Sequence, residues 1–397
     1  MSRHSQALLC SLTTAIVLAV LQAAQAAAAI NDLIVFGDSL SDVGNISSAT
    51  FGTQPGPYYY DGRVSNGPVY AEYLSGALGL GPLTASSTSG DDFAYGGAQT
   101  SGTGGLEGFF IRDVDEQVDV FLTSRSATAD TLYTVFAGAN DIVNGLTDMS
   151  ASVGSLASDV ERLIAAGARQ FLVPNLPRLG TVPRFSGDAV AAATATALSE
   201  NFNAQLAAAL DSLETSWPTV TFIRFDTASL FEDIMANPAV YGFANVTDPA
   251  AAGLSVGDSS YDTNLIVAEP NTYLFWDELH PTTFAHEMLA EKMRATVLAA
   301  LAVPGDGNQD GHVDGLDYLL WAGQYGDNPA ADPPGPPTNG DFNGDSVVDG
   351  LDYLVWAGHF RQGTLDSAAV PEPGGVSILL VSGFLLAANT RLYTRRV

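Results

Sequence analysis

The chain has 397 residues, of which 44 are Asp or Glu and 15 are Lys or Arg, so its formal net charge at pH 7 is −29. Such a charge argues against nucleic acid as a partner and against a strongly anionic membrane surface, whereas neutral esters, glycans and calcium ions stay compatible. The length suits two domains and provides ample material for one large core.

The first 29 residues predict a secretory signal peptide. They contain no acidic residue and one Lys or Arg, Arg3, and an apolar stretch from Ala7 to Val20 leads to the small-residue cleavage pattern Ala24-Gln25-Ala26. A membrane-spanning helix is the alternative, but the apolar stretch is short for one. The only cysteine, Cys10, lies in this segment, so the mature chain would have no disulfide and no thiol nucleophile. We therefore expect an exported protein.

Short apolar segments alternate with amphipathic ones from Ile30 to about Val303. The predicted strands are Leu33–Phe36, Thr131–Ala137, Gln170–Pro174 and Val220–Phe225, and the predicted helices are Tyr70–Leu78, Val153–Ala166, Ala189–Leu213 and Phe284–Ala300. This alternation predicts an α/β fold with a mainly parallel sheet covered by helices on both faces. In such sheets functional loops gather beyond the carboxyl ends of the strands, which is where Ser39 and Asn140 fall.

A nucleophile, an acid and a base follow one another in the chain as in a hydrolase triad. Ser39 comes just after the first predicted strand, in FGDSL, and Asp277 and His280 lie three residues apart in WDELHP. A serine hydrolase needs an oxygen nucleophile, an imidazole to take its proton and a carboxylate to hold the imidazole. The only other histidine between residues 30 and 303, His286, has no matching carboxylate motif, so we assign the base to His280. A helix N-cap is the alternative role for Ser39.

Five blocks of sequence, in order, resemble the GDSL family of esterases and lipases, also called SGNH hydrolases. The blocks are FGDSLSDVGN at 36–45, GRVSNGP at 62–68, FAYGGA at 93–98, GAND at 138–141 and DELHPT at 277–282. The resemblance covers nearly all of residues 30–303 and implies a three-layer α/β/α, flavodoxin-like hydrolase domain with a parallel central sheet. It also implies a two-step acyl-enzyme route that needs no metal.

The resemblance gives each site residue a role. Ser39 would be the nucleophile, His280 the general base and then acid, and Asp277 the residue that orients His280. The oxyanion hole would consist of the backbone N–H groups of Ser39 and Gly97 and the side-chain amide of Asn140. The sequence does not separate Gly96 from Gly97 as the second donor.

Two further features of this domain bear on the site. Asp92 stands where family members often carry Asn, so we expect the departure to affect the support of the following loop more than catalysis. The run Tyr58-Tyr59-Tyr60 either lines the pocket or forms a packed aromatic cluster, and the cluster is favoured.

Residues 304–363 form a second, small module that contains two copies of one unit, at 305–319 and 340–354, separated by a Pro-rich linker. The copies resemble dockerin repeats, which implies a small all-α module with EF-hand-like calcium loops and a cohesin-like partner protein. A solvated acidic linker is the alternative. Ca²⁺ would be bound by oxygen ligands at loop positions one, three, five, seven, nine and twelve, namely Asp306, Asn308, Asp310, His312, Asp314 and Asp317, and Asp341, Asn343, Asp345, Val347, Asp349 and Asp352. At position seven, His312 and Val347 would contribute a backbone carbonyl.

Residues 364–397 resemble a PEP-CTERM sorting signal. Pro371-Glu372-Pro373 precedes an apolar stretch, Val376–Ala388, and arginines close the chain. The resemblance implies processing by an exosortase-type enzyme and an extracellular or surface location in a bacterium that produces exopolysaccharide. A plain membrane anchor is the alternative.

Together these patterns predict an exported serine hydrolase of carboxylic esters, an esterase or lipase, whose Ca²⁺ belongs only to the second module. Two alternatives stay open. One is a carbohydrate acetylesterase that acts on polysaccharide, and the other is a surface or matrix attachment protein with an idle triad. No motif specifies the acyl chain length or the natural substrate.

Overall fold

The computed structural model describes residues 30–103, 107–308, 312–328 and 339–361. These residues divide into two compact units, the first ending at Ala302 and the second beginning at Val303. The predicted signal peptide and sorting tail lie outside the described residues.

A parallel sheet forms the centre of the first unit. Its strands follow the order β1 (Asp32–Gly37), β2 (Thr131–Phe136), β3 (Gln170–Pro174) and β4 (Thr221–Phe225), and every pairing is parallel. β1, β2 and β3 are buried along nearly their whole length, as continuous apolar strands are when helices cover both faces. The four predicted strands are therefore confirmed to within one residue at each end.

A short extended segment at residues 91–95 adds a fifth position to this sheet. The N–H of Val35 donates to the carbonyl of Asp91 at 3.0 Å, and the N–H of Phe93 donates to the carbonyl of Val35 at 2.8 Å. Since β2 occupies one edge of β1, this segment lies along the other edge. When the strands are numbered along the chain, with this segment as the second and β2, β3 and β4 as the third, fourth and fifth, their order across the sheet is 2-1-3-4-5. This is the order of flavodoxin-like sheets.

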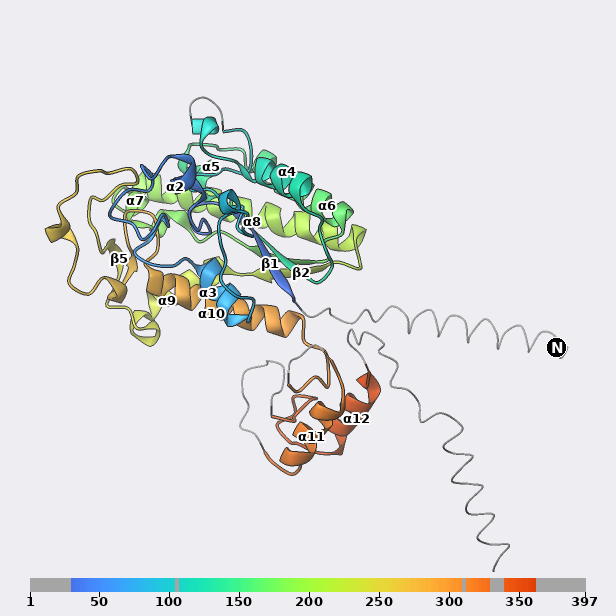
Figure 1. The fold of residues 1–397 in the computed structure, drawn as a ribbon. Coiled ribbons are helices and arrows are strands. Elements are labelled where there is room, and N and C mark those ends of the chain that lie inside the picture. The colour runs from blue at the N-terminus through green and yellow to red at the C-terminus, as the bar shows by residue number, and fades with distance from the viewer. Residues whose placement is uncertain (1–29, 104–106, 309–311, 329–338, 362–397) are drawn as a thin grey trace, which may run out of the picture. The chain divides into compact units, whose positions relative to one another are not determined.

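Helices cover both faces of the sheet (Figure 1). α3 (Tyr70–Ala77) and α10 (Thr283–Ala300) pack together on one face, and α4 (Val114–Ser124), α6 (Met149–Ala166) and α8 (Ala189–Ser216) pack together on the other. The four predicted helices are confirmed, although α6 begins at Met149 because Asp148 caps it by accepting the N–H of Ser150. α4 was not predicted; its first turn is held by a capping box between Asp113 and Glu116.

Shorter elements complete the first unit. They are the helices α2 (Asn45–Ala49), α5 (Ala139–Val143), α7 (Pro183–Ser186) and α9 (Thr227–Ala236), the two-stranded parallel sheet β5 (Asn245–Pro249) and β6 (Tyr273–Phe275), and six 3₁₀ turns (Ser86–Thr88, Glu107–Phe109, Leu179–Thr181, Pro238–Tyr241, Thr263–Leu265, Pro270–Thr272). Beside the main core, a second buried cluster joins the loop between α2 and α3 to the segments between β5 and β6 and just after β6. Its members are Tyr59, Val64, Ala250, Ala251, Leu254 and Trp276.

In the second unit the two sequence repeats form equivalent halves. Each copy leads into a helix, α11 (Gly315–Gln324) after the first and α12 (Gly350–His359) after the second. The indole N–H of the tryptophan on each helix donates to the other copy. Trp321 donates to the carbonyl of Asp349 and Trp356 donates to that of Asp314, both at 2.8 Å. No helix in the described parts of either unit is long and apolar enough to cross a membrane.

Candidate active site

Ser39 lies immediately beyond the carboxyl end of β1, where the chain turns sharply. A side chain at Gly37 would place its Cβ 2.5 Å from the carbonyl oxygen of Phe136, so only glycine lets β1 pass this close to β2 before the turn. The carboxylate of Asp38 accepts the N–H of Leu40 at 3.0 Å and fixes the turn. Burial raises the pKa of Asp38 to about 6. The chain is therefore constrained just before Ser39, at Gly37, and just after it, at Leu40.

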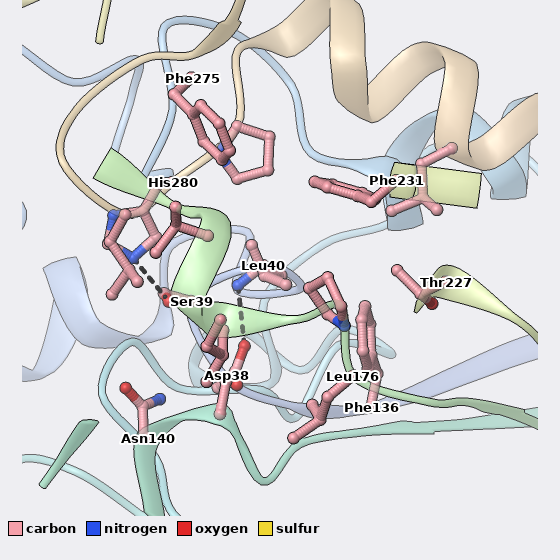
Figure 2. A pocket seen from close by; sticks show the side chains of 17 residues that line it. Asp38, Ser39, Leu40, Phe136, Asn140, Leu176, Thr227, Phe231, Phe275 and His280 are labelled. Atoms are coloured by element: carbon pink, nitrogen blue, oxygen red, sulfur yellow. Dashed lines mark hydrogen bonds between the residues drawn. The ribbon is translucent and has the colours of Figure 1, made fainter. Parts of the chain in front are cut away.

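The structure brings Ser39, His280 and Asp277 together in one relay. The Ser39 Oγ lies 2.9 Å from Nε2 of His280 (Figure 2), and Nδ1 of His280 lies 2.9 and 3.0 Å from the two carboxylate oxygens of Asp277. Oδ1 of Asp277 also accepts the backbone N–H groups of Leu279 and His280, at 2.8 and 2.7 Å. The acid and the base are thus locked together within a single turn of chain.

The protonation states suit this relay. Burial alone would raise the pKa of Asp277, but the charge of His280 and the hydrogen bonds from His280 and Leu279 hold that pKa below its ordinary value. Because an ionised carboxylate only accepts hydrogen bonds, the proton of a neutral His280 belongs on Nδ1. Nε2 is then free to accept the Ser39 hydroxyl proton.

His286 takes no part in the relay. It is fully buried on α10, where its Nδ1 accepts the backbone N–H of Tyr70 at 3.2 Å. Burial lowers the pKa of His286 to about 3, so the ring stays neutral in the core. The structure therefore brings His280, and not His286, within hydrogen-bonding distance of Ser39.

The loop at Gly96 and Gly97 separates these two glycines. The N–H of Gly96 donates to Oδ2 of Asp42 at 2.7 Å and so is not available to a substrate. Gly97 adopts a left-handed φ of 85° and lines the cleft beside Ser39, and its N–H has no partner in the described structure. The geometry favours Gly97 as the donor.

Asn140 faces the same cleft from the first turn of α5. Its Nδ2 donates one hydrogen to the carbonyl of Ala98 at 2.9 Å, which fixes the amide while a second hydrogen remains. The side chain is almost fully buried, as is that of the neighbouring Asp141, which accepts hydrogen bonds from Thr100 and Ser152. The amide of Asn140 is thus oriented before any substrate binds.

Asp92, where the sequence departs from the family pattern, supports the start of the loop that contains Gly96 and Gly97. Its carboxylate accepts the N–H groups of Val43 at 2.8 Å and Ala94 at 3.1 Å. Burial, together with the charge of Asp42, raises the pKa of Asp92. Each of the two carboxylate oxygens therefore accepts one backbone N–H, and both bonds help to fix the loop.

Two cavities meet at Ser39 and His280. One is an open cleft of about 410 Å³ with a mixed polar and apolar lining that includes Gln54, Asn144, Arg184 and Glu278. The other, shown in Figure 2, is a smaller pocket of about 40 Å³ with a mainly apolar lining that includes Leu40, Phe136, Leu176, Phe231 and Phe275. A bound ester could therefore extend in two directions of different chemistry.

Sequence reasoning missed one contact of the triad. The phenol O–H of Tyr59 donates to Oδ2 of Asp277 at 2.7 Å, and both side chains are buried. Tyr59 packs in the second cluster, so the prediction that the tyrosine run forms an aromatic cluster holds for this residue. The run itself indicates aromatic packing but carries no sign of a partner 218 residues away.

Most of the residues named as calcium ligands lie in the described part of the second unit; Asp310 does not. Asp314 and Asp349 cap α11 and α12, and Asp317 and Asp352 complete the capping boxes. Across the described ranges of both units, no three His, Cys, Asp or Glu side chains gather closely enough to hold a metal ion.

A comparison with known families agrees with this geometry. Residues 33–293 match the model of the GDSL-like lipase/acylhydrolase family, which is more than half of the chain. The chain belongs to this family. By that membership the first unit is a carboxylic ester hydrolase, which we call the GDSL domain below.

Two curated relatives illustrate the similarity. The thermolabile hemolysin of Vibrio parahaemolyticus is 32% identical over 282 residues, which cover 66% of this chain and 63% of that protein. The phosphatidylcholine-sterol acyltransferase of Aeromonas hydrophila is 28% identical, over 68% of this chain and 91% of that protein. Among solved structures, a lipolytic G-D-S-L family protein of Veillonella parvula covers 67% of this chain and 96% of its own at 14% identity, with a TM-score of 0.36.

Proposed function

We propose that the protein is an exported serine hydrolase that cleaves carboxylic esters through an acyl-enzyme. The observation that supports this most directly is the unbroken relay from Ser39 through His280 to Asp277, with both contacts near 2.9 Å. Such geometry places the nucleophile, the base and the orienting acid within hydrogen-bonding reach before substrate arrives. An idle triad in an attachment protein has no need of this alignment.

In the first step the Ser39 Oγ attacks the ester carbonyl carbon while its proton passes to Nε2 of His280. The oxyanion that forms is stabilised by the N–H groups of Ser39 and Gly97 and by the amide of Asn140, each donor contributing about 2.7–4 kcal/mol. His280 then gives its proton to the departing alcohol. Water repeats the sequence on the acyl-enzyme, with His280 again as base, and releases the acid.

The different linings of the two cavities suit the two ends of an ester. The apolar pocket receives the acyl chain, and the open cleft receives the alcohol and, later, the water. Since roughly 10–15 Å³ holds one water-sized group, a pocket of about 40 Å³ holds about three such groups. We therefore expect a preference for acyl chains of about two to four carbons.

Hydrolysis of nitrophenyl esters from acetyl to palmitoyl by the purified full chain tests this proposal. The matched variants are Ser39→Ala and Ser255→Ala, because both serines line the open cleft but Ser255 lies outside the relay. Turnover that is lost in Ser39→Ala and kept in Ser255→Ala supports the mechanism. Turnover that survives in Ser39→Ala, or no turnover on any ester, rejects it.

A carbohydrate acetylesterase is the second candidate, and the polar lining of the open cleft favours it. Gln54, Asn144, Arg184 and Glu278 supply the donors and acceptors that a sugar would need on the alcohol side. Release of acetate from acetylated polysaccharide, compared with hydrolysis of tributyrin and phosphatidylcholine, separates this candidate from a lipase. Equal rates on all three would leave no role for a sugar site.

We propose further that the second unit is a dockerin-like module that binds Ca²⁺ through its two loops. The second loop supports this, because Ser346 at position six adopts a φ of 69° and its N–H donates to Oδ2 of Asp341 at 2.8 Å. That turn is the one for which an EF-hand loop normally uses glycine. The ion in each loop would be held by the oxygen ligands given for that loop in the sequence analysis. It would stabilise the loop and take no part in ester hydrolysis.

Calorimetric titration of the full chain with Ca²⁺ tests the module, with Asp341→Ala and Asp306→Ala as single-loop variants. We expect two sites in the wild type and one in each variant. No heat of binding, or two sites in every variant, would reject the assignment. If Ca²⁺ binds as expected, the calcium-loaded chain is the form with which to search for the cohesin-like partner that the resemblance implies.

The terminal segments complete the proposal. Residues 1–29 would direct export, and residues 364–397 would direct exosortase-type processing at the surface of an exopolysaccharide-producing bacterium. Mass spectrometry of the protein isolated from its host would reveal both cleavages. Recovery of the uncleaved chain in the cytoplasm would reject both.

A further inference from the structure

Tyr59 contacts the acid of the relay directly. Its O–H donates to Oδ2 of Asp277 at 2.7 Å, and Nδ1 of His280 lies 2.9 Å from the same oxygen. Oδ1 of Asp277 has its own backbone donors at residues 279 and 280. Among the described residues, Tyr59 and His280 are thus the two whose side chains bond to the carboxylate of Asp277.

A rigid setting surrounds Tyr59. The second cluster joins the loop at 55–64 to the loop at 250–267, where the N–H of Gly257 donates to the carbonyl of Pro55 at 2.7 Å and the N–H of Tyr261 donates to the hydroxyl of Tyr58 at 2.7 Å. The segment after β6 that carries Asp277 joins the same cluster, since the N–H of Ala251 donates to the carbonyl of Trp276 at 2.8 Å. The phenol of Tyr59 is therefore aimed at Asp277 by packing on several sides.

We propose that Tyr59 is a positioning residue of the triad, which fixes the carboxylate of Asp277 and weakens its hold on a proton-bearing His280. The inference rests on the proposed function of the GDSL domain. It concerns a residue outside the five motif blocks, in a loop that also borders the alcohol-side cleft.

The sign of the effect follows from the shared oxygen. A donor that satisfies part of the carboxylate's charge leaves less of it to stabilise the imidazolium, so Tyr59 favours the neutral His280 that acts as base. Burial, together with the charge and hydrogen bond of Asp277, raises the pKa of Tyr59 above its usual range, so the phenol keeps its proton. Four other titratable groups lie close enough for their charges to act on this relay, namely Asp38, Asp258, Tyr261 and His286. None of them is replaced in the variants below.

The test compares Tyr59→Phe with Tyr58→Phe in the full chain. Both variants keep the ring and lose one hydroxyl in the same loop, but the hydroxyl of Tyr58 bonds to Tyr261 and not to the triad. For Tyr59→Phe we expect kcat to fall about 3- to 30-fold with KM within about twofold, because a carboxylate that has lost this donor no longer holds His280 in line with Ser39, and this loss of positioning outweighs the stronger attraction for the imidazolium. We also expect the acid limb of the pH profile of kcat/KM to move up by about half a unit, because His280 then binds its proton more tightly.

For Tyr58→Phe we expect a pH profile that superimposes on that of the wild type. An unshifted profile in Tyr59→Phe, or equal shifts in both variants, would overturn the proposal and leave Tyr59 a packing residue.

A second measurement does not depend on any substrate. The Nδ1 proton of His280 can be followed as a low-field proton resonance, assigned by its loss in Asp277→Asn. We expect it to move to lower field in Tyr59→Phe, because the carboxylate then accepts more strongly, and to stay in place in Tyr58→Phe. If the wild type hydrolyses no ester, the proposed function fails while this resonance still decides the role of Tyr59.

Discussion

The carboxylate of Asp42 accepts the backbone N–H of Gly96 at 2.7 Å, although the two residues are 54 positions apart in the chain. The same carboxylate accepts the N–H groups of Gly44, Asn45 and Ile46 where α2 begins, at 2.7, 2.6 and 3.0 Å. One buried acid therefore ties the start of α2 to the loop that carries Gly97, the proposed oxyanion donor. With the N–H of Gly96 engaged, the next residue alone is left to face the substrate.

Asp42→Asn should impair catalysis more than substrate binding. The amide would turn an N–H₂ toward two of the four backbone donors, at Gly44 and Asn45 or at Ile46 and Gly96. In either orientation the tie between the start of α2 and the loop at residues 96 and 97 would be weakened. We expect kcat to fall about 10- to 100-fold with little change in KM, since a hydrogen bond to a charged group is worth about 1.5–3 kcal/mol.

The control for this variant is Asp188→Asn. Asp188 accepts two backbone N–H groups at the exposed start of α8, away from the site, so its loss should lower stability and leave kcat unchanged. Equal losses of kcat in the two variants would contradict a specific role for the anchor.

Asn140→Ala should remove one oxyanion donor. The remaining amide hydrogen of Asn140 faces the cleft, while the bond to Ala98 fixes its direction. We expect kcat to fall about 10²- to 10³-fold while KM stays nearly constant, because the donor acts mainly in the transition state. Asn144→Ala is the matched control, since Asn144 lines the same cleft. A similar loss there would point to general disturbance of the cleft.

The sequence predicted the main sheet because its strands are continuous apolar runs bounded by polar turns. It missed α4 and the edge segment at 91–95, for different reasons. α4 carries acidic residues through its first turns, and the edge segment is too short to show a period of two. Its pairing with β1 is a long-range contact that no local pattern carries.

The site divides in the same way. Ser39, Asp277 and His280 could be predicted because each lies in a local motif, and the last two meet within one turn. The choice of Gly97 over Gly96 required the position of Asp42, and the role of Tyr59 required a contact across 218 residues. The walls of the apolar pocket come from β2, α9, α10 and the loop after β3, and no motif links these segments.

Phe231→Ala should lengthen the preferred acyl chain. Phe231 on α9 lines the apolar pocket and is nearly buried, so its removal extends the space beyond Ser39. We expect the ratio of kcat/KM for hexanoyl over acetyl esters to rise about tenfold, as about 1–3 kcal/mol per methylene in an apolar pocket allows.

Phe243→Ala is the control for the pocket. Phe243 is buried to a similar degree and packs on Phe284, outside the lining, so both variants lose about 3–5 kcal/mol of stability but only one enlarges the pocket. A chain-length profile that does not move in Phe231→Ala would assign the acyl chain to the open cleft instead.

His286→Asn should flatten the acid side of the stability profile. The folded-state pKa of His286 is lowered by burial to about 3, whereas the unfolded chain takes up its proton near 6.5. Between these values the unfolded state binds one proton more than the folded state, so the free energy of unfolding falls as the pH falls. The fall due to this one residue amounts to at most about 1.4 kcal/mol per pH unit.

Asparagine cannot take up that proton and still offers an acceptor for the N–H of Tyr70, which Nδ1 of His286 accepts in the wild type. Urea unfolding at pH 7, 6, 5 and 4 should therefore give a shallower slope for the variant, by about one proton, even if packing makes it less stable at pH 7. His359→Asn replaces a histidine of the second unit and should leave the slope of the GDSL domain unchanged. Parallel slopes in the wild type and His286→Asn would mean that His286 does not govern acid unfolding.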